Sequence, residues 1–92
     1  MEITVHYLAQ LKRAAGVATE NVTVEDGCSL SQVLKGLADR HGPAFRAGLL
    51  DEHGQPLPAL LFFLGAEQVR PDSARPLCEG DEVTILSPMS GG

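Results

Sequence analysis

The sequence is poor in basic residues and has no long apolar run, and each absence excludes a class of function. Lysine and arginine together number 7 against 12 aspartates and glutamates, so the formal net charge is −5. A protein that binds nucleic acid needs a basic face to displace counterions from phosphates, so neither DNA nor RNA is expected as a partner. No apolar stretch approaches the roughly 20 residues that cross a bilayer, so no membrane partner is expected either.

Cysteine and histidine are also scarce, which argues against a disulfide framework and against a metal site. Cys28 and Cys78 lie far apart in the sequence, without a second thiol near either of them. A disulfide is not expected, because the first residues show the alternation of a strand and not the pattern of a signal peptide. The histidines, His6, His41 and His53, have no metal-ligand spacing. A soluble cytoplasmic protein without a metal is the simplest interpretation.

Aliphatic residues predict a globular core. Hydrophobic residues make up 43% of the 92 residues and aromatic residues only 4%, so leucine and valine must supply most of the core. A chain of this length forms one domain, residues 1–92, near the lower size limit for a self-sufficient core.

The clearest element is a helix over residues 30–41. Ser29 begins an S-x-x-Q capping box with Gln32, and Gly42 followed by Pro43 is the expected stop. One face of this helix carries Leu30, Val33, Leu34, Leu37, Ala38 and His41.

Period-2 patterning and short apolar runs predict the remaining elements. Residues 8–16 read as a structured loop or a single turn, and Phe45 and Leu49 indicate a short second helical piece. The predicted strands cover residues 2–7, 21–24, 59–64, 68–70 and 83–86. One main helix packed on one mixed sheet is an α+β roll, in which the first and last strands pair in parallel at the centre.

The chain ends on two glycines directly after the last predicted strand. The tail of residues 87–92 reaches roughly 20 Å at about 3.3 Å per residue. Glycine has no Cβ, so it can enter a narrow channel and leave its carboxylate open to attack. A carboxylate is a poor electrophile and needs ATP for activation, yet the sequence has no G-x-x-x-x-G-K-[ST] motif. Partner enzymes must therefore use the ATP, while this chain is not an enzyme on its own and binds no cofactor.

These features, in this order, resemble the MoaD/ThiS family of ubiquitin-like sulfur carriers. The segment from Val5 to Gly16 resembles the opening strand and loop of the MoaD branch. The segment from Gly80 to Leu86 resembles its G-D-E-V strand, and Pro88 to Gly92 resembles its P-x-[ST]-G-G tail. The resemblance covers essentially the whole chain. It implies a β-grasp (ubiquitin-like) roll with one main helix and a flexible C-terminal Gly-Gly tail.

The resemblance also implies a reaction at the C-terminus. A MoeB-type enzyme, similar to ubiquitin-activating enzymes, would adenylate Gly92, and a persulfide would then supply the sulfur of a thiocarboxylate. In the MoaD branch this group gives its sulfur to the molybdopterin precursor, which the large subunit of molybdopterin synthase holds. Pro88, Met89, Ser90 and Gly91 would enter the partner's active site ahead of Gly92.

Other destinations remain open at this stage. The segment from Gly48 to Phe63 also looks like carriers that serve cysteine biosynthesis, and thiamine biosynthesis is a further possibility. A protein modifier would share the activation step and then join Gly92 to lysines of its targets. A plain interaction domain with an incidental glycine ending is the remaining alternative.

The run from Leu60 to Leu64 is apolar on both faces, although a sheet covered by helices on one side needs only one apolar face. Either the loop of residues 43–58 buries the second face, or that face is an exposed docking patch for a partner. In the second interpretation Phe62 and Leu86 point outward. The residues that line the core are then Leu61, Phe63, Val83 and Ile85.

Overall fold

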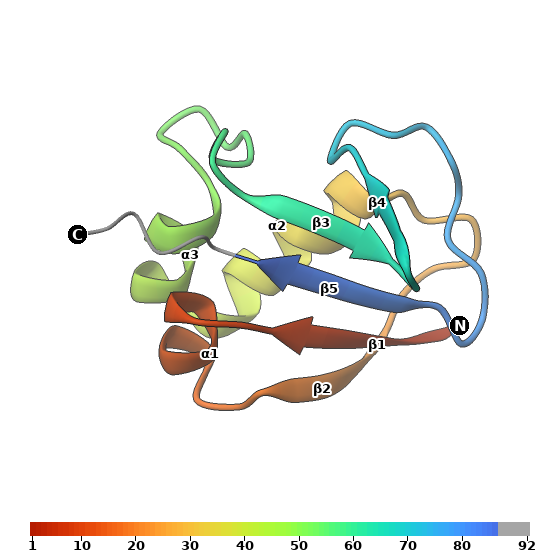
Figure 1. Ribbon diagram of the computed structural model, residues 1–92, viewed down its shortest axis with the longest axis horizontal. Coiled ribbons are helices and arrows are strands. Elements are labelled where there is room, and N and C mark those ends of the chain that lie inside the picture. The colour runs from red at the N-terminus through yellow and green to blue at the C-terminus, as the bar shows by residue number, and fades with distance from the viewer. Residues whose placement is uncertain (87–92) are drawn as a thin grey trace.

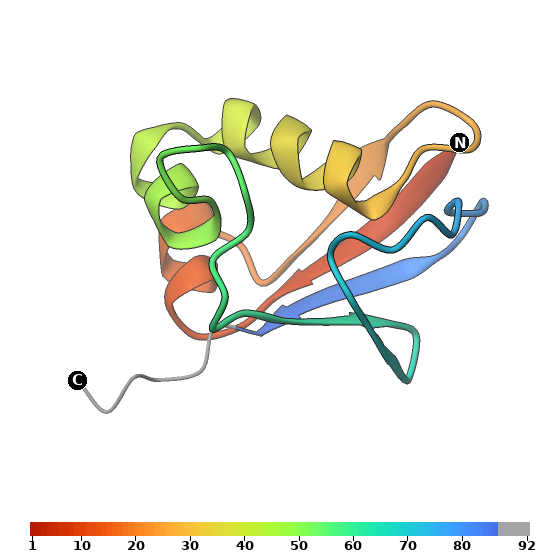
Figure 2. The ribbon, with the colours of Figure 1, turned by 90° about the horizontal axis from the view of Figure 1, so that it is seen from above.

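The structure, a computed structural model, describes residues 1–86. These residues form a five-stranded mixed sheet with helices against one face (Figure 1). Turning the molecule shows all the helices on the same side of the sheet (Figure 2). The elements are β1 (Glu2–Tyr7), α1 (Gln10–Ala15), β2 (Thr19–Thr23), α2 (Leu30–His41), α3 (Pro43–Leu49), β3 (Leu61–Leu64), β4 (Glu67–Val69) and β5 (Glu82–Leu86).

The strand order is β2-β1-β5-β3-β4, with β1 and β5 paired in parallel at the centre and the other neighbours antiparallel. A parallel pair needs a long crossover, and here the chain between β2 and β5 supplies it with α2 and α3. The α+β roll and its central parallel pair, both predicted from the sequence, are confirmed. Among the described residues, no helix is both long enough and apolar enough to cross a bilayer.

Helix α2 has the bounds that its local sequence predicts. The Ser29 hydroxyl accepts a hydrogen bond from the Gln32 amide (3.4 Å), and the Gln32 side chain accepts one from the Ser29 amide (2.9 Å), so both halves of the capping box form. Gly42 ends the helix with a φ of 87°. Pro43 then begins α3, because its fixed φ suits the first residue of a helix.

The segment of residues 8–16 contains a short helix, α1, and not only a loop or single turn. Leu11 is its buried residue, which anchors the helix to the core. Gly16 ends it in the left-handed conformation, with a φ of 82°. Alanine at position 9 has a φ of 56° and a ψ of −126°, a region that costs a residue with a Cβ about 1–3 kcal/mol.

The core lies between the sheet and the helices. It is formed by the inward residues of β1 and β5, the apolar face of α2 and the ends of α3. The largest fully buried side chains are those of Tyr7, Phe45, Phe62, Ile3, Leu11, Leu34, Leu37, Leu49, Ile85, Val5 and Val83.

The predicted facing of the third strand is wrong. The ladder between β3 and β5 places Phe62 opposite Ile85, and Phe62 is only 1% exposed. Residues directly opposite each other in a ladder share a face, so Phe62 points into the core. Leu61 and Phe63, which were expected inside, are half-buried on the outer face. A uniformly apolar run has no period-2 signal, so its sequence does not distinguish two registers that differ by one residue.

Candidate functional site

The residues predicted to carry the chemistry follow the central strand β5 in the sequence. Gly92 and the segment from Pro88 to Gly91 (Met89 and Ser90 included) lie outside the residues that the structure describes. Their point of attachment is described: β5 ends at Leu86, between β1 and β3. The Leu8 amide donates a hydrogen bond to the Ile85 carbonyl (3.3 Å), so the residues after β1 lie against the end of β5.

An apolar patch surrounds this point on the outer face of the sheet. Leu86 lies opposite Leu61, and Phe63 pairs with Thr84 one step along the same face. These three apolar side chains are half-buried, and the adjacent Leu8 is 42% exposed. We call Leu8, Leu61, Phe63 and Leu86 the outer patch. Partly exposed apolar side chains that gather on one face are typical of a protein-docking surface.

A basic pair lies on α1, at the same end of the molecule as the outer patch (Figure 1). Lys12 and Arg13 border a shallow hollow of about 550 Å³, together with Gly16 and Val17. Within the described residues neither of them has a carboxylate partner. The other arginines do: the ion pairs are Arg40–Glu20, Arg46–Asp39, Arg70–Asp72 and Arg75–Glu67.

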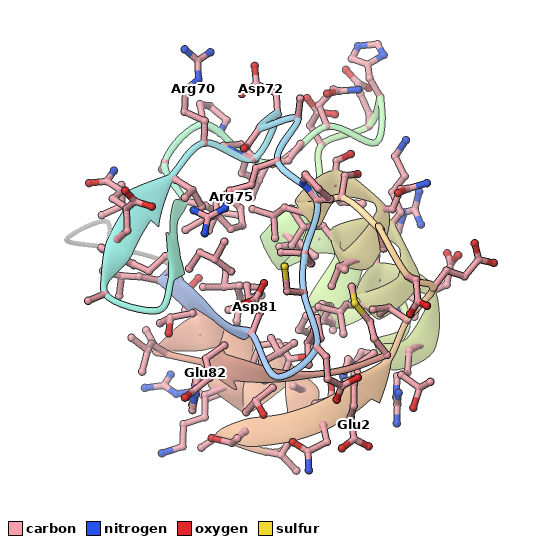
Figure 3. The ribbon with its side chains drawn as sticks, turned by 90° about the vertical axis from the view of Figure 1, so that its right-hand side faces the viewer. Glu2, Arg70, Asp72, Arg75, Asp81 and Glu82 are labelled. Atoms are coloured by element: carbon pink, nitrogen blue, oxygen red, sulfur yellow. The ribbon has the colours of Figure 1, made fainter. Side chains whose placement is uncertain are left out.

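The charges of the sheet and its loops are unevenly placed. Figure 3 shows the end of the molecule remote from α1, where Glu2, Asp81 and Glu82 lie and where Arg70 and Asp72 pair with each other. The unpaired cations of α1 are therefore at the end where residue 87 continues the chain, although the protein as a whole is acidic. This end therefore presents two cations on α1 as well as the apolar outer patch.

A partly buried polar cluster joins the opposite, inward face of β1 to the end of α2. The Tyr7 hydroxyl and His41 Nε2 both donate to the same oxygen of Glu20, Oε1, each over 2.5 Å. The aromatic rings of Tyr7 and Phe45 pack edge to face, with their centroids 5.4 Å apart. Sequence patterning did not indicate Glu20, because only the register Val5–Glu20 between β1 and β2 turns this carboxylate inward.

The environment of this cluster shifts two pKa values in opposite directions. Burial by itself would raise the pKa of Glu20, but the hydrogen bonds from Tyr7 and His41 outweigh it and hold that pKa below its ordinary value of 4.5. Burial, followed by the bond to Glu20, raises the pKa of the Tyr7 hydroxyl far above its ordinary range. Glu20 is therefore a carboxylate at neutral pH, and Tyr7 is a neutral donor.

We expect Glu20→Gln to lower the free energy of unfolding at neutral pH by about 1–3 kcal/mol, because the charge-assisted bonds are lost. A carboxylate with a depressed pKa contributes its stability above the unfolded-state value of 4.5 and loses it as the pH falls through the lower folded-state value. The difference between Glu20→Gln and wild type should therefore shrink on acidification. Melting curves across this pH range measure it, with Glu52→Gln on the exposed surface as the control. A difference that stays constant with pH would contradict this account.

The remaining candidate residues are dispersed. His6 bonds Glu82 on the outer face (2.7 Å), and His53 lies in an exposed loop. Both cysteines are free thiols, and burial, followed by the charge of Glu25, raises the pKa of Cys28. Among residues 1–86 no three histidine, cysteine, aspartate or glutamate side chains gather as metal ligands would.

Comparisons with known proteins match almost the whole chain. The sequence matches the model of the ThiS family over residues 5–92. It is 35% identical to the molybdopterin synthase sulfur carrier subunit of Chlamydomonas reinhardtii over 92 residues, which is the whole of both chains.

Solved structures confirm the β-grasp fold that the sequence predicts. The crystal structure of SAMP1 from Haloferax volcanii superposes with a TM-score of 0.88 at 23% identity, covering 100% of both chains. Urm1 from Trypanosoma brucei superposes with a TM-score of 0.77 at 21% identity over 99% of this chain and 95% of its own. CysO from Mycobacterium tuberculosis gives 0.69 at 23% identity over 95% and 99%. At these identities the likeness concerns the fold alone.

Proposed function

Because the chain belongs to the ThiS family of ubiquitin-like sulfur carriers, we propose that it carries sulfur as a thiocarboxylate on Gly92 and delivers it in molybdopterin biosynthesis. The observation behind this pathway is the 35% identity, over the full length of both chains, to a molybdopterin synthase sulfur carrier subunit. The matched length includes the terminal Gly91 and Gly92. The acceptor is then the large subunit of molybdopterin synthase, and a MoeB-type enzyme activates the carrier.

The chemistry of a C-terminal carboxylate determines the order of steps. A carboxylate oxygen of Gly92 attacks the α-phosphate of ATP in the activating enzyme, and pyrophosphate leaves. A persulfide sulfur then attacks the acyl carbon, and AMP leaves. A thiol cleaves the resulting acyl disulfide, which releases the thiocarboxylate and leaves a disulfide on the donor side. All of these groups except the Gly92 carboxylate come from partners, so the carrier serves as a substrate and not as the catalyst.

The outer patch and the basic pair of α1 are the surfaces proposed to hold the carrier on its partners. We keep Leu86 as a proposed docking residue, as the sequence predicted. Phe62 is buried, so Phe63 replaces it as the proposed aromatic docking residue. Apolar side chains at an interface centre with charges at its rim are the usual composition of such contacts. Both surfaces lie at the end of the molecule where β5 ends, so docking through them would bring the chain after Leu86 toward the partner's active site.

We expect intact-protein mass spectrometry to show sulfur in place of one oxygen on Gly92 when the chain is co-expressed with a MoeB-type enzyme and a sulfur donor. The same chain expressed without the activating enzyme is the control and should keep the carboxylate mass. Absence of the heavier species with several such enzymes would contradict the carrier function. A ladder of larger conjugates on antibody blots would instead favour a protein modifier.

A further inference from the structure

A groove between the edge strand β2 and helix α2 has no role in the proposed sulfur transfer. β2 forms one margin of the sheet in Figure 1, and α2 lies behind the sheet. The hollow between them measures about 300 Å³. Its lining includes Val22, Val24, Val33, Gly36, Leu37 and Arg40.

The outer edge of β2 presents backbone groups that can pair with another strand. The Val24 amide donates to the Met1 carbonyl and the Tyr7 amide to the Ala18 carbonyl, each over 2.8 Å. In this antiparallel ladder the even-numbered residues of β2 bond to β1, so Thr19, Asn21 and Thr23 direct their N–H and C=O groups away from the sheet. Natural edges are commonly protected by lysine, proline or an inward-pointing charge; Thr19–Thr23 has no lysine or proline, and its one inward charge, Glu20, is bonded to Tyr7 and His41.

Gly36 is an unexplained glycine on the wall of this groove. It lies in the interior of α2, where glycine is less favourable than alanine. A Cβ at this position would meet no atom within 4 Å, so packing in this molecule does not require glycine. A glycine here leaves room for a further chain to approach the helix.

The groove has opposite charges at its two ends. Arg40, which is half exposed, lies at the start of β2, where it forms an ion pair with Glu20 at 3.8 Å, too long for a hydrogen bond. Glu25 lines the other end, and the exposed Asp26 follows it. An extended segment with an acidic residue at one end and a basic residue at the other therefore complements the groove.

We propose that this groove binds an extended segment of a partner polypeptide, which adds a strand to β2 and inserts alternate apolar side chains between β2 and α2. Main-chain hydrogen bonds to Thr19, Asn21 and Thr23 supply the pairing, and the groove selects the side chains. A second copy of this chain fits less well, since its own β2 would bring the inward Glu20 carboxylate toward an apolar lining.

The test is an NMR titration of the isotope-labelled full chain with the peptide acetyl-Lys-Thr-Val-Thr-Val-Thr-Glu-amide. Antiparallel to β2, this probe places its glutamate beside Arg40 and its lysine beside Glu25. We expect shifts in the amides of Thr19, Asn21, Thr23 and Gly36. Gly36→Leu, which fills the groove, should weaken binding at least about tenfold. Asn21→Pro removes a backbone N–H that points away from the sheet and is not bonded to β1, so this variant should also weaken peptide binding at least about tenfold.

Gly36→Ala is the matched control, because it adds a methyl group where there is open space. It should raise the melting temperature and keep the peptide affinity within about twofold. Three results would overturn the proposal: no binding at about millimolar peptide, shifts confined to other elements, or wild-type affinity in Gly36→Leu. A dimer of the free chain with its interface on β2 would also overturn it, by making a second copy the occupant. Deletion of Gly92 should leave the titration unchanged, so this result is independent of the sulfur-carrier function.

Discussion

Phe62→Ala will lower the free energy of unfolding by about 3–5 kcal/mol, the loss typical of a large aromatic side chain removed from a packed core. Phe62 is 1% exposed and lies opposite Ile85 on the inward face of the sheet. Truncation leaves a cavity there that the surrounding side chains fill only in part. Chemical denaturation measures the change as a lower midpoint with an unaltered slope.

Phe63→Ala is the matched control for that prediction, because it removes the same side chain one position along the strand. Phe63 is half-buried on the outer face, so its loss should destabilise the fold much less. As part of the outer patch it should instead weaken binding to the activating enzyme or the acceptor subunit by about tenfold or more. If Phe63→Ala unfolds the protein and Phe62→Ala only weakens binding, β3 is shifted by one residue from the register described here.

Deletion of Gly92 will abolish thiocarboxylate formation while the melting temperature stays unchanged. The shortened chain still ends in a glycine carboxylate, but that group stops about 3.3 Å short of its former position. Since a misplacement of about 1 Å can cost 100-fold in rate, activation should fall at least that far. Stability should not change, because the described core extends only as far as Ile85. Pyrophosphate exchange by the activating enzyme and the mass of the product measure the loss.

Gly92→Ala separates the need for a carboxylate at this position from the need for glycine. It keeps the length of the chain and the terminal carboxylate and adds one Cβ. If the partner's channel admits only glycine, this variant should also be a poor substrate. Full activity of Gly92→Ala would contradict the narrow-channel argument, and full activity of the deletion would contradict the proposed role of Gly92 itself.

The elements predicted correctly from the sequence are those whose signals are local. The capping box of Ser29 and Gln32 and the helical spacing of the apolar residues determine α2, because these interactions join residues within one or two turns. The alternation in β1 predicts which of its side chains are buried, and Ile3, Val5 and Tyr7 confirm it. The terminal Gly91 and Gly92 suggest their chemistry directly, because it depends on a missing Cβ and a free carboxylate.

The sequence by itself therefore determined the order of the strands and the main helix, and it suggested Gly92 as the residue to carry the reactive group. Only the tertiary structure decided which face of β3 is buried, because every residue of that strand is apolar and its pairing with β5 selects the register. The same holds for Glu20, which turns inward through the pairing of β1 with β2. The outer patch also depends on the tertiary structure. Its residues Leu8, Phe63 and Leu86 are distant in sequence and come together only because β1, β5 and β3 lie side by side.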